Sequence, residues 1–156
     1  MKIIEYKSTE LTKEIAEHLA RIDKICFPID AWTKKDWIEL FDKQPTTSSI
    51  QVFLGYDDKC ETPIAAAVWQ KIQFAQTGYF ISNAVLPEYR GKGYGEALLI
   101  TRITEAKKLH IKFLFAHTRI SNGTSQKLLL YYGFKPNSIV SHYYLDEDAI
   151  EWKKEL

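Results

Sequence analysis

The feature that most constrains the fold is a stretch in the middle of the chain where an apolar run ends at a proline and passes through three glycines into a helix. The run from Tyr79 to Leu86 is aromatic and aliphatic, and Pro87 closes it where a backbone donor is lost. Beyond Gly95, apolar residues recur at helical spacing. The sequence therefore predicts a strand, a glycine loop and a helix that meet within a few residues.

The predicted helix after the glycines has two unlike sides. Apolar residues form one broad stripe, namely Leu98, Leu99, Ile103, Ala106 and Leu109. The other side carries Glu96, Arg102, Glu105 and Lys108. We expect the apolar stripe to pack on the rest of the protein.

The glycine loop has the properties of an anion site. Gly91, Gly93 and Gly95 let a ligand approach the backbone and permit dihedrals that other residues avoid. At a helix N-terminus the unpaired N–H groups and the macrodipole favour a phosphate, and Arg90 and Lys92 add positive charge. The sequence therefore predicts a ligand that carries phosphates.

Two common phosphate loops do not fit. A P-loop needs Lys-Ser/Thr after its last glycine, where this chain has Glu96 and Ala97, and the dinucleotide fingerprint needs G-x-G-x-x-G, where this chain has G-x-G-x-G. Arg90, Gly93 and Gly95, after the strand Ala84 to Tyr89, resemble the Arg-x-x-Gly-x-Gly signature of the GCN5-related N-acetyltransferases (GNAT). The resemblance implies an α/β fold with a central mixed, mostly antiparallel sheet flanked by helices, and acetyl-coenzyme A as cosubstrate. It implies that the coenzyme contacts Val85, Leu86, Arg90, Gly91, Lys92, Gly93, Tyr94, Gly95 and Asn122.

Length and composition limit the other possibilities. At 156 residues we expect a single N-acetyltransferase domain over residues 1–156. The formal net charge of +1 gives no general attraction to nucleic acid or a membrane. Cys26 and Cys60 suggest neither a disulfide framework nor a metal site, and we expect both to be small buried residues. With no signal-peptide core or bilayer-spanning segment in view, we expect a cytoplasmic protein.

The remaining elements follow from periodicity and punctuation. In the first half of the chain we expect a strand at 3–7, a helix capped by Ser8 or Thr9 that ends near Phe27, and a second helix capped by Thr33. A polar loop at 44–49 follows and is the best candidate for a mobile segment. Two hairpin strands are expected at 50–56 and 64–72. After the central helix we expect a strand at 112–117, a helix capped by Ser121 or Asn122 and ended by Gly133, and a last strand near 139–145.

Acetyl transfer to an amine needs a group that accepts a proton, and His117 at the end of its predicted strand is the natural base near neutral pH. A lone histidine there could equally be structural. His117 to Asn122 resembles the same segment of the protein N-terminal acetyltransferases, in which a histidine before Ile-Ser-Asn is the proposed base and a tyrosine at the position of Tyr79 works with it. The resemblance also implies that backbone amides near Val85 and Leu86 polarise the thioester carbonyl. Where many relatives have a tyrosine acid, this chain has Leu129, with Tyr132 one turn away as a weak substitute.

Two segments bear on the acceptor. Phe27, Pro28 and Ile29 resemble the wall that holds the first residue of the acceptor peptide, and Tyr143 and Tyr144 resemble the tyrosine pair that closes the peptide groove; each aromatic could instead be core packing. The resemblance therefore favours the N-terminal α-amino group of a protein or peptide as acceptor. A small amine or a lysine side chain stays open as the acceptor, because an acidic rim could be formed by Asp30, Asp36, Asp146, Glu147 and Asp148. A third possibility is that the protein binds coenzyme A without turnover. The sequence leaves the oligomeric state open.

Overall fold

A computed structural model describes residues 1–156, and its framework is one seven-stranded sheet in the order β1-β2-β3-β4-β5-β7-β6. All neighbouring strands are antiparallel except β4 and β5, which are parallel. The mixed, mostly antiparallel sheet of the predicted fold class is therefore confirmed. The strands are β1 (Lys2–Tyr6), β2 (Ser48–Tyr56), β3 (Ala65–Ile72), β4 (Thr77–Val85), β5 (Phe113–Arg119), β6 (Lys135–Val140) and β7 (Ala149–Glu155).

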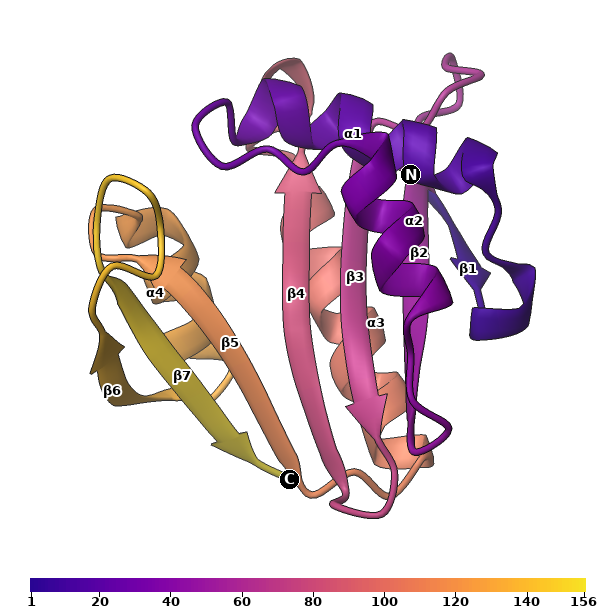
Figure 1. The fold of residues 1–156 in the computed structure, drawn as a ribbon. Helices are drawn as coiled ribbons and strands as arrows, with labels where there is room; N and C mark the ends of the chain where they lie inside the picture. Colours follow the sequence, from indigo (N-terminus) through magenta and orange to yellow (C-terminus); the bar gives the residue numbers. More distant parts are fainter.

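The two parallel strands pair along only half of their length. Pairing runs from Thr77 opposite Phe113 to Phe80 opposite Ala116, although β4 continues to Val85 and β5 to Arg119. A register shift in the β3–β4 ladder leaves Ile81 without a partner, and such a bulge bends its strand. Beyond this point β4 and β5 diverge, as Figure 1 shows.

Helices cover both faces of the sheet. In Figure 1, α1 (Lys13–Cys26) and α2 (Lys34–Asp42) lie in front of β2, β3 and β4, and α3 (Tyr94–Lys108) lies behind them. The fourth helix, α4 (Gly123–Tyr131), follows β5, and short 3-10 turns occupy Ser8–Glu10 and Pro87–Tyr89. None of these helices is both long and apolar enough to cross a bilayer.

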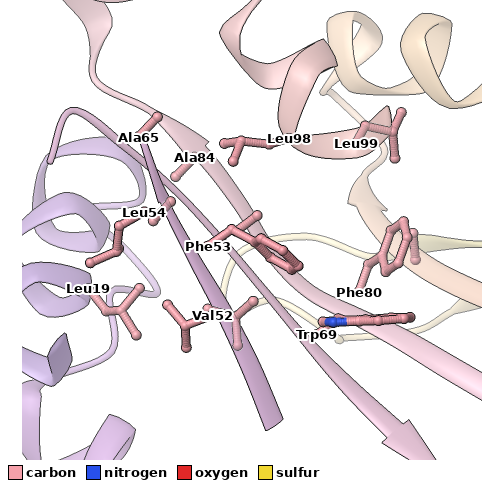
Figure 2. Close-up of a cluster of buried hydrophobic side chains, with 14 of the residues drawn as sticks. Leu19, Val52, Phe53, Leu54, Ala65, Trp69, Phe80, Ala84, Leu98 and Leu99 are labelled. Carbon is pink, nitrogen blue, oxygen red and sulfur yellow. The ribbon is translucent and has the colours of Figure 1, made fainter. Parts of the chain in front are cut away.

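The core explains why β2 and β3 are continuous apolar runs. Alternate side chains of a strand point to opposite faces, and both faces of these strands are covered. Figure 2 shows Leu19 of α1 on the side of Val52 and Leu54, and Leu98 of α3 on the side of Phe53. At 25–30 cal/mol per Å², burying such side chains stabilises the fold by roughly 1.5–3 kcal/mol each.

Several local predictions need correction. The first helix is capped by Thr12, whose Oγ1 accepts from the Ile15 N–H at 3.3 Å, and not by Ser8 or Thr9, which lie in the preceding 3-10 turn. The predicted cap Thr33 is confirmed, with a reciprocal bond to Asp36. The predicted polar loop at 44–49 is shorter, because β2 begins at Ser48.

The last strand was predicted in the wrong place. Residues 141–148 form a loop between β6 and β7, so Tyr143 and Tyr144 lie on no strand. The strand β7 lacks the apolar alternation by which strands are predicted. Its sequence is AIEWKKE, with four charged residues, and it buries only Ala149 and Trp152.

The cysteines and Arg102 also differ from expectation. Cys26 and Cys60 are free and only half-buried, with the Cys26 thiol donating to the Val85 carbonyl at 3.4 Å. On α3 the predicted apolar stripe is buried except for Leu109, which lies at its C-cap and is half-buried. Arg102, expected on the opposite side, is 1% exposed.

Candidate active site

A cavity of about 650 Å³ opens where β4 and β5 diverge. One end is lined by aromatic and aliphatic side chains of the loops between α1 and α2 and between β6 and β7, and the other end by α4. His117, Ile81 and Asn83 lie on the strands between these ends. The cavity thus connects two chemically different regions through the gap in the sheet.

His117 lines this cavity from β5. Its Nε2 lies 3.3 Å from Glu151 Oε2 on the neighbouring strand β7, and its ring stacks on Tyr143 with centroids 4.4 Å apart. Burial lowers the pKa of His117, and the Glu151 carboxylate opposes that shift without cancelling it. The imidazole is therefore neutral at neutral pH and able to accept a proton.

Tyr79 does not lie opposite His117, the residue with which the resemblance pairs it. It is opposite Phe115 in the paired part of β4 and β5, and the two rings stack with centroids 5.3 Å apart. It does not line the cavity, and no hydrogen bond joins its hydroxyl to His117. Its catalytic role stays a prediction.

The glycine loop has the backbone that an anion site needs. Gly91 and Gly93 have φ values of 75° and 81°, in the left-handed region that favours glycine. The N–H groups of residues 91–96 form no hydrogen bonds, and the first that does is Ala97, which donates to the Gly93 carbonyl at 2.9 Å. These six donors surround the N-terminus of α3, where the macrodipole favours negative charge.

The side chains around this loop are tied to their neighbours. Arg90 Nε donates to the Val85 carbonyl at 2.9 Å, Lys92 Nζ lies 5.4 Å from the centre of the Tyr89 ring, and the Tyr94 hydroxyl donates to Asp57 Oδ2 at 3.3 Å. Arg90 is thus directed back toward β4.

The two predicted backbone donors on β4 differ. The Leu86 N–H donates to the Ile64 carbonyl at 2.9 Å and is not free, so of the amides near Val85 and Leu86 that of Val85 stays the candidate donor to a thioester. Because successive N–H groups of a strand point to opposite sides, the Val85 N–H faces away from β3, toward the gap.

Asn122 has the capping role that its sequence position suggested. Its Oδ1 accepts from the Ser125 N–H at 3.2 Å, and the residue also lines the cavity. Leu129, 7% exposed, lines the same end. Tyr132 does not: its hydroxyl donates to Glu96 Oε1 at 2.5 Å, which raises the pKa of Tyr132 to about 12.

The predicted acceptor residues come together at the loop end. Phe27, Ile29, Tyr143 and Tyr144 line the cavity, whereas Pro28 does not. Ile29 and Tyr143 are about half exposed, at 54% and 50%. An apolar wall is therefore open to solvent at this end.

Arg119 at the end of β5 was not anticipated. Its guanidinium forms ion pairs with Asp30, Asp146 and Glu147 and lies 4.4 Å above the Tyr144 ring. It thereby joins the two loops, and it lowers the pKa of Asp146. Three of the five acids considered as an acidic rim thus share one guanidinium, so this cluster still carries more negative than positive charge.

Asp23 of α1 was also missed, although it lies one helical turn after Leu19 on the apolar side of its helix. It lines the cavity, is 6% exposed, and accepts from the Trp32 N–H at 3.4 Å. Burial raises the pKa of Asp23 to about 6, against the opposing effect of the Trp32 hydrogen bond and of the nearby Trp37 indole. No group of three or more His, Cys, Asp and Glu side chains could hold a metal ion.

Known proteins share this architecture. Residues 15–134 match the acetyltransferase (GNAT) family. A Bacillus subtilis (strain 168) protein named provisionally as a ribosomal protein bS18 alanine N-acetyltransferase is 36% identical over 86 residues, which are 53% of this chain and 54% of that protein. The chain spans about half the length of the curated relatives that it matches.

Solved structures agree over nearly the whole chain. The Escherichia coli ribosomal-protein-S18-alanine N-acetyltransferase superposes with a TM-score of 0.78 at 22% identity, covering 99% of this chain and 94% of that one. A structure of the NatC complex bound to Gag peptide and CoA has a TM-score of 0.71 at 22% identity, covering 100% and 99%. At this identity the likeness establishes the fold.

Proposed function

Because the chain belongs to the acetyltransferase (GNAT) family, we propose that it transfers an acetyl group from acetyl-CoA to the α-amino group of a peptide or protein. The observation that carries the proposal is the single cavity that passes from the open apolar wall, past His117, to α4. A reaction between two substrates that enter from opposite sides requires such a passage.

The coenzyme would occupy the α3 and α4 side. Six unpaired N–H groups at residues 91–96 can receive its pyrophosphate, and the free Val85 N–H can bond the pantetheine arm or the thioester oxygen. Asn122 lines the path between these points. Arg90, now bonded to the Val85 carbonyl, would have to release it to reach the phosphates.

His117 would act as the base. An α-amino group has a pKa near ~7.7 to 8.0 and is largely protonated at neutral pH, so a first proton must leave to solvent before the nitrogen has a lone pair for attack. The neutral amine nitrogen then forms the new bond to the carbonyl carbon, His117 takes the second proton from that nitrogen, and the carbon–sulfur bond breaks to release coenzyme A thiolate. Glu151 and Tyr143 hold the imidazole in place. Since Leu129 provides no hydroxyl, we propose that the thiolate takes its proton from water.

The acceptor end supports a peptide with an apolar first residue. Phe27, Ile29 and Tyr143 present carbon surface, and Arg119 already engages the nearby acids. Because three carboxylates share the single charge of Arg119, the mouth stays negatively charged, and a polycationic amine is the rival acceptor that the next experiment tests.

The test incubates the protein with acetyl-CoA, free peptides of varied first residue, N-blocked lysine peptides and polyamines, and locates the acetyl group by mass spectrometry. We expect acetylation of free α-amino ends, with a preference for apolar first residues. Modification confined to lysine or polyamines would overturn the acceptor assignment, and saturable coenzyme binding without product would overturn the enzyme.

The role of His117 is tested separately. His117→Ala should lower kcat by about 100- to 10,000-fold, the usual contribution of a general base. The control is His18→Ala on α1, outside the cavity, which should leave kcat unchanged. Turnover by His117→Ala equal to wild type at every pH would contradict the assignment.

A further inference from the structure

Arg102 on α3 is a buried cation without a carboxylate partner. Its side chain is 1% exposed, it lines the cavity, and it forms no salt bridge. Burial lowers its pKa to about 9, still above neutral pH, so the guanidinium stays charged. A buried charge without a counterion costs stability, and here the Phe80 ring, whose centre lies 4.1 Å from Cζ, and neutral oxygens stand in for a carboxylate. Packing alone therefore does not explain an arginine here.

The neutral oxygens that Arg102 contacts gather around the bulge of β4. Nη1 donates to the Ser82 carbonyl at 3.0 Å and lies 3.5 Å from the Val68 carbonyl, while Nε donates to the Leu98 carbonyl at 3.3 Å within its own helix. Ser82 and Val68 face each other across β4 and β3, directly beside the unpaired Ile81. The guanidinium thus holds the backbone where β4 turns away from β5.

A second contact leads from the bulge to the glycine loop. Arg102 Nη2 donates to Asn83 Oδ1 at 2.9 Å, and Asn83 Nδ2 donates to the Gly95 carbonyl at 3.4 Å. Asn83 itself lines the cavity. A continuous chain of polar contacts therefore runs from the bulge, through Arg102 and Asn83, to the first turn of α3.

We propose that Arg102 is a positioning residue that fixes the β4 backbone at the reaction centre relative to the glycine loop at residues 91–96. The proposal rests on the proposed acetyl transfer. Its fixed positive charge, held behind β4 in a poorly solvated region, also favours the negative charge that develops on the thioester oxygen. On this proposal the arginine is kept despite the stability that its desolvation costs, because the geometry of the site depends on its contacts.

The test compares Arg102→Met, which keeps length and removes every donor, with Arg102→Lys, which keeps the charge. We expect Arg102→Met to lower kcat by about 10- to 100-fold, the scale of a misplaced reacting group, with the KM for the amine within about twofold. Its thermal midpoint should equal or exceed that of wild type, because a buried unpaired charge is removed. Arg102→Lys should recover part of kcat.

Two further variants isolate the mechanism. The matched control is Arg21→Met on α1, outside the cavity, which should not change kcat. Asn83→Ala breaks the chain at an exposed residue and should lower kcat in the same direction, with the Arg102→Met, Asn83→Ala pair losing less than the product of the single effects. A folded Arg102→Met with kcat within about twofold of wild type would overturn the proposal, as would independent effects in the pair.

Hydrogen exchange provides a readout that does not require turnover. In Arg102→Met and Asn83→Ala, the hydrogen-bonded amides at the start of α3, beginning with Ala97, and those of β4 near Ser82 should exchange faster than in wild type, whereas α1 should not change. If wild type acetylates no amine, the proposed function fails while this comparison still decides the coupling. Unchanged exchange in both segments would refute it.

Discussion

Replacing Asp23 by asparagine should make the protein more stable at neutral pH and leave it nearly unchanged in acid. Burial raises the pKa of the Asp23 carboxyl from 3.8 to about 6, even though the Trp32 N–H donates to it. A carboxyl with a raised pKa binds its proton more tightly in the folded state. Its unfavourable contribution is therefore absent below about pH 3.8, grows as pH rises to about 6, and is then constant.

The magnitude follows from the shift. A displacement of about two pKa units corresponds to about 3 kcal/mol at neutral pH, taken as an upper limit. By linkage the contribution is about 1 kcal/mol near pH 4.5, so the difference between Asp23→Asn and wild type should grow by about 2 kcal/mol between about pH 4.5 and about pH 7.5. The amide oxygen of asparagine can still accept from Trp32, so the substitution removes the charge and little else.

The assay is denaturant unfolding followed by tryptophan fluorescence at a series of pH values, with the free energy of unfolding of each variant compared at each pH. Asp58→Asn, at an exposed turn position, controls for the loss of one negative charge. A difference that stays flat with pH would show that burial does not dominate. A difference of opposite sign would show that the Trp32 hydrogen bond stabilises the anion more than burial disfavours it.

Two other predictions concern the site. Glu151→Gln removes the charge that raises the pKa of His117, so that pKa should fall further. The acidic limb of the pH–rate profile should then move to lower pH. An acidic limb that does not move would show that His117 is not the group that titrates there. Gly93→Ala places a side chain at φ 81° and should weaken acetyl-CoA binding and cost about 1–2 kcal/mol of stability, measured by calorimetry and denaturation. Gly123→Ala, where an added Cβ meets nothing within 4 Å and φ is ordinary, should do neither; equal effects of the two would contradict the backbone argument.

Features of the sequence that depend on neighbouring residues were predicted well. The strand, proline, glycine loop and helix of residues 79–109 need only local chemistry, and the structure places the left-handed glycines and the free amides where the sequence suggested. The caps Thr33 and Asn122 follow from hydroxyl or amide groups three residues before the N–H that they accept from. The family resemblance was carried by the same local stretch, and the comparisons confirm it.

Features that depend on pairing between distant segments were not predictable from local pattern. The charged strand β7 is a strand because β5 and β6 supply its partners on both sides, and only that pairing brings Glu151 to His117. Arg119 shows the same limit, since its three carboxylate partners come from two loops more than twenty residues away.

The sequence by itself determined which chemical groups are available: a glycine loop before a helix, a histidine at a strand end and a set of aromatic side chains. Only the tertiary structure decided which groups are charged, buried or free. Helical spacing put Arg102 on the outward side of α3, yet the bulge in β4 offers carbonyls that draw it inward. Electrostatic environment depends on solvent exclusion by segments distant in the chain, and helical or strand periodicity does not record it.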